Sequence, residues 1–243
     1  MIDSRERENA LLLGIDTCGA AGSVALARVQ DGRMMVLGEA SVASRECAAG
    51  LVPAIAELLR QADCTMGMVD GVVVVHGPGS FTGIRVGVAT AKGLVEARAL
   101  PLLAISRLAI LAAVGETDCA ALDAWRGQIF VGLRTADGWQ ERLVTAGEFR
   151  VAENSLQLPE RVAVCEESVA QLLEALAEES RVVRVAAPGA VQALEFAQPR
   201  WLAGEWEDAT ALDGYYLRGT ERGMESELKL GTDARAGTAR NAE

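Results

Sequence analysis

Histidine is nearly absent from this chain of 243 residues, in which His76 is the only one. That scarcity excludes paired-histidine metal sites, including the HExxH zinc motif. A catalytic Ser–His–Asp or Cys–His arrangement would have to use His76, which runs straight into a glycine-rich loop and is better explained as the end of a strand. The sequence therefore assigns neither a catalytic residue nor a metal ligand.

Features of secreted and membrane proteins are missing as well. The chain has five cysteines, an odd number, and no CxxC pair, so neither a disulfide framework nor a zinc ribbon is indicated. We expect buried thiols in a reducing compartment. No apolar run has the length of a signal peptide or a membrane span. These absences predict a soluble, cytoplasmic protein with no membrane partner.

Aromatic and basic residues are also scarce. Aromatic residues make up 4% of the chain and hydrophobic residues 50%, so the core must be built largely from Ala, Val and Leu. Against 34 acidic residues stand 23 basic ones, which gives a net charge of −11. A surface this negative repels phosphate backbones, so any contact with RNA would need another chain to hold the RNA.

What the sequence does contain is an alternation of apolar runs and glycine-rich turns. The runs predict strands at 11–16, 23–29, 34–42, 71–75 and 102–105. Helical spacing predicts helices at 46–60 and 84–97.

The opening plan of the chain is repeated in its second half. Residues 118–133 again place an apolar strand that ends in an aspartate, a short turn and a second strand, and a helix at 167–177 and a strand at 181–186 follow. We therefore expect an α/β protein with two lobes of similar topology and a cleft between them. The expected boundaries are a flexible N-terminus at 1–10, lobes at 11–105 and 106–219, and a flexible tail at 220–243.

The most conspicuous loop, GPGSFTGIR, begins at Gly77 between a predicted strand and a predicted helix. Such a loop can turn backbone N–H groups toward a phosphate. It lacks the Gly-Lys-Ser/Thr of a Walker A loop, and Gly83 comes one residue late for GxGxxG. Two interpretations stay open, a tight turn with a serine or threonine helix cap and a phosphate-facing loop. The second would use Gly77, Gly79, Ser80 and Thr82.

Acidic residues end the first strand of each predicted lobe. Asp16, followed by Thr17, and Asp123 would face one another across the cleft. In a two-lobed phosphotransferase such acids hold Mg²⁺ and orient a nucleophile. An Asx turn that caps a hairpin is the structural alternative.

The helix after the loop carries two rows of small residues. Each row has a spacing of four: Gly83, Gly87 and Ala91 in one, and Ala89, Gly93 and Ala97 in the other. A glycine inside a helix costs about 1 kcal/mol relative to alanine, so we expect another backbone to approach closely. Either burial against the sheet or a helix-on-helix interface would explain this, and each row can serve one purpose.

Four segments resemble the bacterial TsaB family, formerly called YeaZ: IDTCGAAGSVALA, VVHGPGSFTGIRVGVATAKGL, ALDAWRGQIFVGL and YYLRG. The resemblance runs from about Leu11 to Gly219, and GPGSFTGIR followed by a small-residue helix is its most specific part. It implies an actin-like, hexokinase-like ATPase (ASKHA) fold, in which two RNase H-like lobes have mixed sheets flanked by helices.

The resemblance also implies a function. TsaB proteins take part in making threonylcarbamoyladenosine, the modified base next to the anticodon of tRNAs that read A-starting codons. In that family the glycoprotease-like relative TsaD carries the metal-binding histidines and transfers the threonylcarbamoyl group. TsaB is a non-catalytic scaffold that pairs with TsaD through N-lobe helices and supports assembly with the ATPase TsaE. The tRNA would be reached only through TsaD, no cofactor is required by this chain, and ATP or ADP at the cleft or at a complex interface stays open.

The two apolar helices predict the partner interface. Its expected residues are Cys47, Ala48, Leu51, Ile55, Leu58, Gly83, Gly87 and Ala91. A second copy of the chain is the alternative partner for this face. The chain departs from many relatives at Cys47, where they place a histidine, which leaves a polar interface role of this position open.

A hypothesis from another class is an enzyme of the same fold, a small-molecule kinase or ATPase. It would use Asp16, Thr17 and Asp123 around Mg-ATP.

Overall fold

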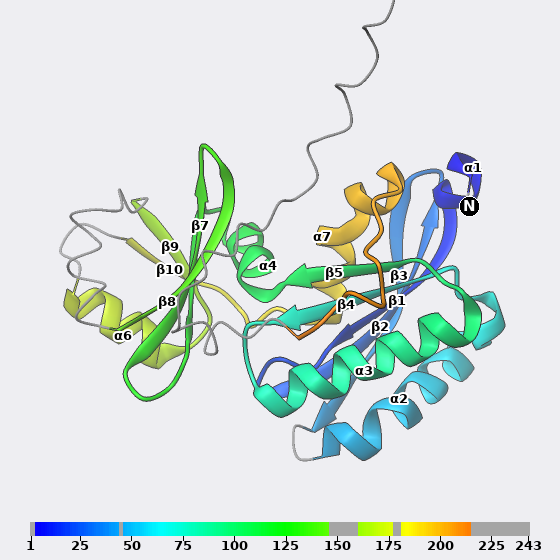
Figure 1. The fold of residues 1–243 in the computed structure, drawn as a ribbon, viewed down its shortest axis with the longest axis horizontal. Helices are drawn as coiled ribbons and strands as arrows, with labels where there is room; N and C mark the ends of the chain where they lie inside the picture. Colours follow the sequence, from blue (N-terminus) through cyan, green and yellow to red (C-terminus); the bar gives the residue numbers. More distant parts are fainter. Residues whose placement is uncertain (1–2, 44–45, 146–159, 177–180, 215–243) are drawn as a thin grey trace, which may run out of the picture.

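The computed structural model describes residues 3–43, 46–145, 160–176 and 181–214, and these form two five-stranded sheets (Figure 1). The first sheet has the order β3-β2-β1-β4-β5. Its strands are β1 (Asn9–Asp16), β2 (Ala21–Gln30), β3 (Arg33–Ala43), β4 (Gly71–Gly77) and β5 (Leu102–Ser106). β1, β2 and β3 pair antiparallel, whereas β4 lies parallel to both β1 and β5.

The second sheet repeats this topology. Its order is β10-β9-β6-β7-β8, and its strands are β6 (Cys119–Asp123), β7 (Gln128–Thr135), β8 (Gly138–Thr145), β9 (Arg161–Val164) and β10 (Arg181–Arg184). β6, β7 and β8 pair antiparallel, and β9 lies parallel to β6 and β10. The central strand of each sheet is thus the first strand of its half, which confirms the repeat expected from the sequence.

Helices cover both faces of the first sheet. The described helices are α1 (Ser4–Glu8), α2 (Cys47–Gln61), the 3-10 turn η2 (Met66–Met68), α3 (Phe81–Arg98), α4 (Arg107–Val114), α6 (Glu167–Leu176) and α7 (Ala190–Ala203). Neighbouring residues of a strand point to opposite faces, and Ile15 of β1 approaches α3 while Gly14 approaches α7. α2 and α3 therefore share one face of the sheet and α7 covers the other (Figure 1).

α4 lies between the two sheets (Figure 1). Its Ile110 belongs to the apolar core of the first sheet, whereas Leu108 and Leu111 pack with Phe130 in a core of the second. α6 covers the other face of the second sheet, where Leu173 is buried. Every strand and helix expected from the sequence is present within a few residues of its expected bounds, and α1, η2, α4, β8, β9 and α7 were not anticipated.

The lobe boundaries need correction, because α7 comes after the second sheet in the chain but packs on the first. Leu194 of α7 lies against Gly14 of β1, and the ring of Trp201 fills the space beside Gly71 of β4. The division at 105/106 therefore does not hold for this helix. An apolar stripe on a helix does not reveal which of two sheets it will cover.

The N-terminus, expected to be flexible at 1–10, is ordered from residue 3 onward. Asp3 caps α1 with a capping box, and the chain then enters β1 at Asn9. The indole N–H of Trp201 donates a hydrogen bond to the carbonyl of Arg7 (2.9 Å). Contact with α7 thus fixes a segment whose charged composition suggested disorder. The expected tail at 220–243 and the YYLRG segment at 215–219 lie outside the described residues.

Candidate functional site

The glycine loop between β4 and α3 packs directly on the turn that follows β1. A methyl group at Gly79 would overlap the Cys18 carbonyl, and one at Gly83 would overlap the Thr17 carbonyl. The Ser80 backbone N–H donates to the carbonyl of Cys18 (2.9 Å). The glycines therefore allow two protein backbones to meet, and the loop's Ser80 N–H is used within the chain.

Ser80 caps the helix that follows. Its hydroxyl accepts a hydrogen bond from the Gly83 N–H (3.3 Å), whereas Thr82 lies exposed in the first turn of α3. Of the two interpretations left open by the sequence, the tight turn with a helix cap describes this loop. The expected phosphate-facing role of Gly77, Gly79, Ser80 and Thr82 has no support in these contacts.

Asp16 and Thr17, at the end of β1, are each only 2% exposed. The Thr17 hydroxyl donates to the Gly83 carbonyl (2.6 Å), and the Asp16 carboxylate accepts from the Cys18 N–H (2.8 Å). Burial raises the pKa of Asp16, and the nearby charge of Arg107 acts against that rise. Both side chains are thus engaged within the protein.

Arg107, the first residue of α4, was not anticipated as a site residue. It is 5% exposed, and its Nη1 lies 3.8 Å from Oε1 of Glu166. Glu166 precedes α6 and also accepts a hydrogen bond from the Asp123 N–H (2.9 Å). We call Asp16, Arg107, Glu166 and Asp123 the interlobe charge cluster, because they come from both halves of the chain.

The electrostatics of the interlobe charge cluster reflect its burial. Desolvation raises the pKa of Glu166, while the Asp123 N–H and the Arg107 charge lower it. The Asp123 carboxylate accepts a hydrogen bond from the Trp125 N–H (2.6 Å). This is the Asx-type contact that the sequence left open as the alternative to a Mg²⁺-binding role. Asp16 and Asp123 are therefore linked through Arg107 and Glu166.

The residues of the interlobe charge cluster do not fit the Mg²⁺ ion that the fold implies for an ATP-binding member. A hard cation of this kind needs carboxylate oxygens that are free to coordinate it. Asp16 is only 2% exposed, and the guanidinium of Arg107 acts on it and pairs with Glu166, so the Asp16 oxygens are not open to a cation. Within the part of the chain that the structure describes, no three His, Cys, Asp or Glu residues are grouped to hold a metal.

The interface expected on α2 and α3 also needs correction. Seven of its eight residues are buried, and the exposed one is Ala48. On α2, Leu51 and Ile55 are 1% and 4% exposed and belong to the core of the first sheet. On α3, a methyl group at Gly87 would overlap the Thr17 hydroxyl. The predicted apolar face is therefore the face that packs on the sheet.

The other row of small residues on α3 is the exposed one. Ala89, Gly93 and Ala97 all face solvent, and nothing lies within 4 Å of a methyl group built at Gly93. On the adjacent α2, Val52 is 58% exposed. We define the α2–α3 surface as eight exposed small or apolar residues of these two helices: Ala48, Ala49, Val52, Pro53, Ala56, Ala89, Gly93 and Ala97.

The single histidine and the thiols have inert surroundings. Burial, followed by the charge of Arg200, lowers the pKa of His76 to about 4, so it is neutral at physiological pH. Burial also raises the pKa of Cys119 to about 12 and that of Cys165 to about 11. All five cysteines are free, and four are buried, as expected. Cys47 is one of these four and lies against Gly22.

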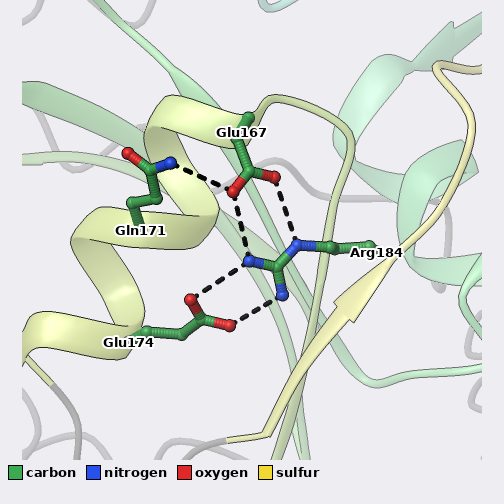
Figure 2. Close-up of polar contacts among 4 residues, drawn as sticks. All are labelled: Glu167, Gln171, Glu174 and Arg184. Atoms are coloured by element: carbon green, nitrogen blue, oxygen red, sulfur yellow. Dashed lines mark hydrogen bonds and ion pairs between the residues drawn. The ribbon is translucent and has the colours of Figure 1, made fainter.

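A second charge cluster lies on the surface of the second lobe (Figure 2). Arg184 of β10 contacts Glu167 and Glu174 of α6, and Gln171 donates to Glu167. The arginine side chain is 47% exposed. Exposed ion pairs contribute little to stability, so this cluster fastens α6 to the end strand of its sheet and carries no site.

None of the helices in the described ranges is long and apolar enough to cross a membrane.

Comparison with known proteins gives a family match. A model of the family described as TsaD, tRNA N6-adenosine threonylcarbamoyltransferase, matches residues 40–192. Over 129 residues the chain is 34% identical to the tRNA threonylcarbamoyladenosine biosynthesis protein TsaB of Haemophilus influenzae, covering 51% of this chain and 53% of that protein. Over 86 residues it is 40% identical to TsaB of Bacillus subtilis, covering 34% of this chain and 38% of that protein. The chain thus spans about half, or less, of the length of these curated relatives.

A solved structure extends the similarity over nearly the whole described chain. YeaZ from Pseudomonas aeruginosa superposes with a TM-score of 0.62 at 28% identity, covering 86% of this chain and 100% of that one. With the repeated sheet topology, this likeness identifies the ASKHA fold with two RNase H-like lobes. The family model covers more than half of the chain, and the chain therefore belongs to the TsaD family, within which it is a member of the TsaB (YeaZ) group.

Proposed function

We propose that this chain takes part in forming threonylcarbamoyladenosine in tRNA, as a non-catalytic partner of a TsaD-type transferase. The observation that carries the proposal is the joint likeness to TsaB proteins in sequence and to YeaZ in fold. The names of the curated relatives give the pathway, and the net charge of −11 favours contact with tRNA through a partner.

The contacts of the interlobe charge cluster support a non-catalytic role. Of the acids that a phosphotransferase would present to Mg²⁺, Asp16 is only 2% exposed, and Asp16 and Asp123 each accept a hydrogen bond from a backbone N–H of the chain. The glycine loop is packed on Thr17 and Cys18. Chemistry would then belong to the TsaD-type partner, with TsaE as the third component. ATP or ADP would bind at a surface shared with these partners rather than among the acids of this cleft.

The α2–α3 surface is the region that we assign to the partner. The buried row of α3 cannot be reached by another chain, whereas Gly93 and its neighbours allow a helix backbone to approach closely. A mid-helix glycine in open space costs about 1 kcal/mol without any compensating contact inside this chain. Contact with another helix would supply the compensation. In the absence of TsaD a second copy of the chain can occupy the same surface.

Reconstitution tests the function. Unmodified tRNA is incubated with the cognate TsaD, TsaE and a source of threonylcarbamoyl-adenylate, with and without this chain, and the modified nucleoside is measured by mass spectrometry. We expect modification to depend on the chain. Equal modification without it would refute the role. Turnover of ATP by the purified chain alone, lost in Asp16→Asn, would favour the kinase or ATPase hypothesis instead.

Matched substitutions test the surface. Ala89→Arg on α3 and Val52→Glu on α2 should abolish co-purification with TsaD, because each places a charge where two helices would meet. Ala175→Arg is the control, since Ala175 is also an exposed helical alanine but lies on α6 of the second lobe. Binding that survives in Ala89→Arg and Val52→Glu would reject the α2–α3 surface while leaving the reconstitution result intact.

A further inference from the structure

A buried guanidinium joins the two lobes at the end of β1. Arg107 is the only basic residue among the fully buried residues that the structure describes. Its side chain is 6% exposed, and its nearest ion-pair partner is Glu166, at 3.8 Å in the second lobe. Its charge also acts on Asp16 of the first lobe, where it opposes the effect of burial.

The Arg107 side chain packs against the turn that follows β1. Its Nη2 would lie 3.0 Å from a methyl group at Gly19, so the guanidinium rests against the turn that follows Asp16. Its Nε is buried and has no hydrogen-bond partner among the described residues. A buried donor without an acceptor is costly, and the attraction between Arg107 and Glu166 offsets that cost.

The carboxylates need such a cation. Asp16 is almost fully buried, and Glu166 has a side chain only 31% exposed. A buried carboxylate without a compensating charge is strongly unfavourable. Arg107 is the basic side chain that pairs with Glu166 and whose charge acts on both carboxylates.

We propose that Arg107 is the resident cation of the interlobe charge cluster: it pairs with Glu166, packs against the turn that follows Asp16, and keeps metal-bound nucleotide away from these acids in the isolated chain. This goes beyond the proposed function, since it states what fixes the two lobes relative to each other. It rests on the contacts of Arg107 alone and would stand or fall without any measurement of tRNA modification.

The test compares Arg107→Met with Arg60→Met. Both replace an ion-paired arginine by an apolar side chain of similar length, but Arg60 is 71% exposed and pairs with Glu57 on the same helix. We expect Arg107→Met to lower the thermal midpoint by several degrees. Amide exchange after β1 and before α6 should become roughly 100-fold faster, which corresponds to loss of one partner from a buried pair. Arg60→Met should change neither.

A double variant covers the case in which Arg107→Met does not fold. Asp16→Asn removes one uncompensated charge, so Asp16→Asn/Arg107→Met should be more stable than Arg107→Met alone. A double variant no more stable than the single one would overturn the proposal. So would an Arg107→Met protein as stable and as protected as Arg60→Met. Calorimetric binding of Mg·ATP to the wild-type chain that Asp16→Asn abolishes would overturn it as well.

Discussion

We expect substitution by alanine to have opposite effects on stability at two glycines of α3. Gly93 faces solvent, so Gly93→Ala gains helix propensity and should stabilise the chain by about 1 kcal/mol. Gly87→Ala gains the same propensity, but its methyl group would collide with the Thr17 hydroxyl. The collision costs about 1–3 kcal/mol in crowding. Displacing the hydroxyl also breaks its buried bond to the Gly83 carbonyl, at about 1–3 kcal/mol.

The expected net loss for Gly87→Ala is about 3 kcal/mol, so the two variants should differ by about 4 kcal/mol. Urea unfolding followed by circular dichroism measures the difference, which with a slope of about 1–3 kcal/mol per M separates the midpoints by more than about 1 M. Equal unfolding slopes would show that both variants unfold from the same native state. A Gly87→Ala protein as stable as wild type would refute the packing described for the end of β1.

The same pair of variants separates folding from binding. If the α2–α3 surface contacts TsaD, the methyl group of Gly93→Ala keeps the partner helix from approaching as closely. We therefore expect Gly93→Ala to bind TsaD more weakly although the isolated chain is more stable. Calorimetric titration of TsaD with each protein measures this, and unchanged affinity would argue that Gly93 lies outside the contact.

Two further substitutions test the packing of α7 and the junction of the lobes. Trp201→Ala removes a side chain that is 1% exposed, together with its bond to Arg7, and should cost about 3–5 kcal/mol and release α1 to rapid amide exchange; Trp125→Ala, at a side chain that is 51% exposed, is the control. Glu141 of β8 accepts hydrogen bonds from Ser106 and Trp139, yet burial raises its pKa from 4.5 to about 6. The folded state therefore binds the proton more tightly than the unfolded state, so stability should fall by about 2 kcal/mol as pH rises from about 4.5 to 6. Glu141→Gln should remove that part of the pH dependence of unfolding, and an unaltered pH profile would contradict the cause given for the pKa.

The strands were predicted correctly from the sequence, whereas the prediction of which side of α3 faces away from the sheet was wrong. Gly83 and Gly87 form a row of small residues, and so do Ala89 and Gly93, but the two rows lie about 120° apart around the helix. Spacing alone does not say which row faces the sheet. The apolar Ile84, Val88 and Val95 share the buried side, while Arg85 and Glu96 flank Ala89 on the exposed side. Those neighbours carried the information that would have identified the exposed row.

No comparable signal was available for Arg107. It follows Ser106 in no recognisable motif, and an arginine is ordinarily expected at the surface. Its burial depends on Asp16 and Glu166, which are far away in the sequence and meet only when both lobes are folded. The placement of α7 could not be predicted from the sequence either, because its apolar residues suit either sheet.

Both connections between the lobes converge on the end of β1. The first runs from β5 into α4, whose first residue, Arg107, acts on Asp16. The second runs from β10 into α7, where the N–H of Ala190 donates to the hydroxyl of Ser23 (2.8 Å), and Ser23 is the partner of Asp16 in the β1–β2 pair. In a nucleotide-binding member of such a fold, this strand end would present its acid to a metal ion. In this chain the same acid lies buried in the field of Arg107, so a substitution that frees Asp16 to bind a cation would also disturb the ion pair between Arg107 and Glu166 of the second lobe.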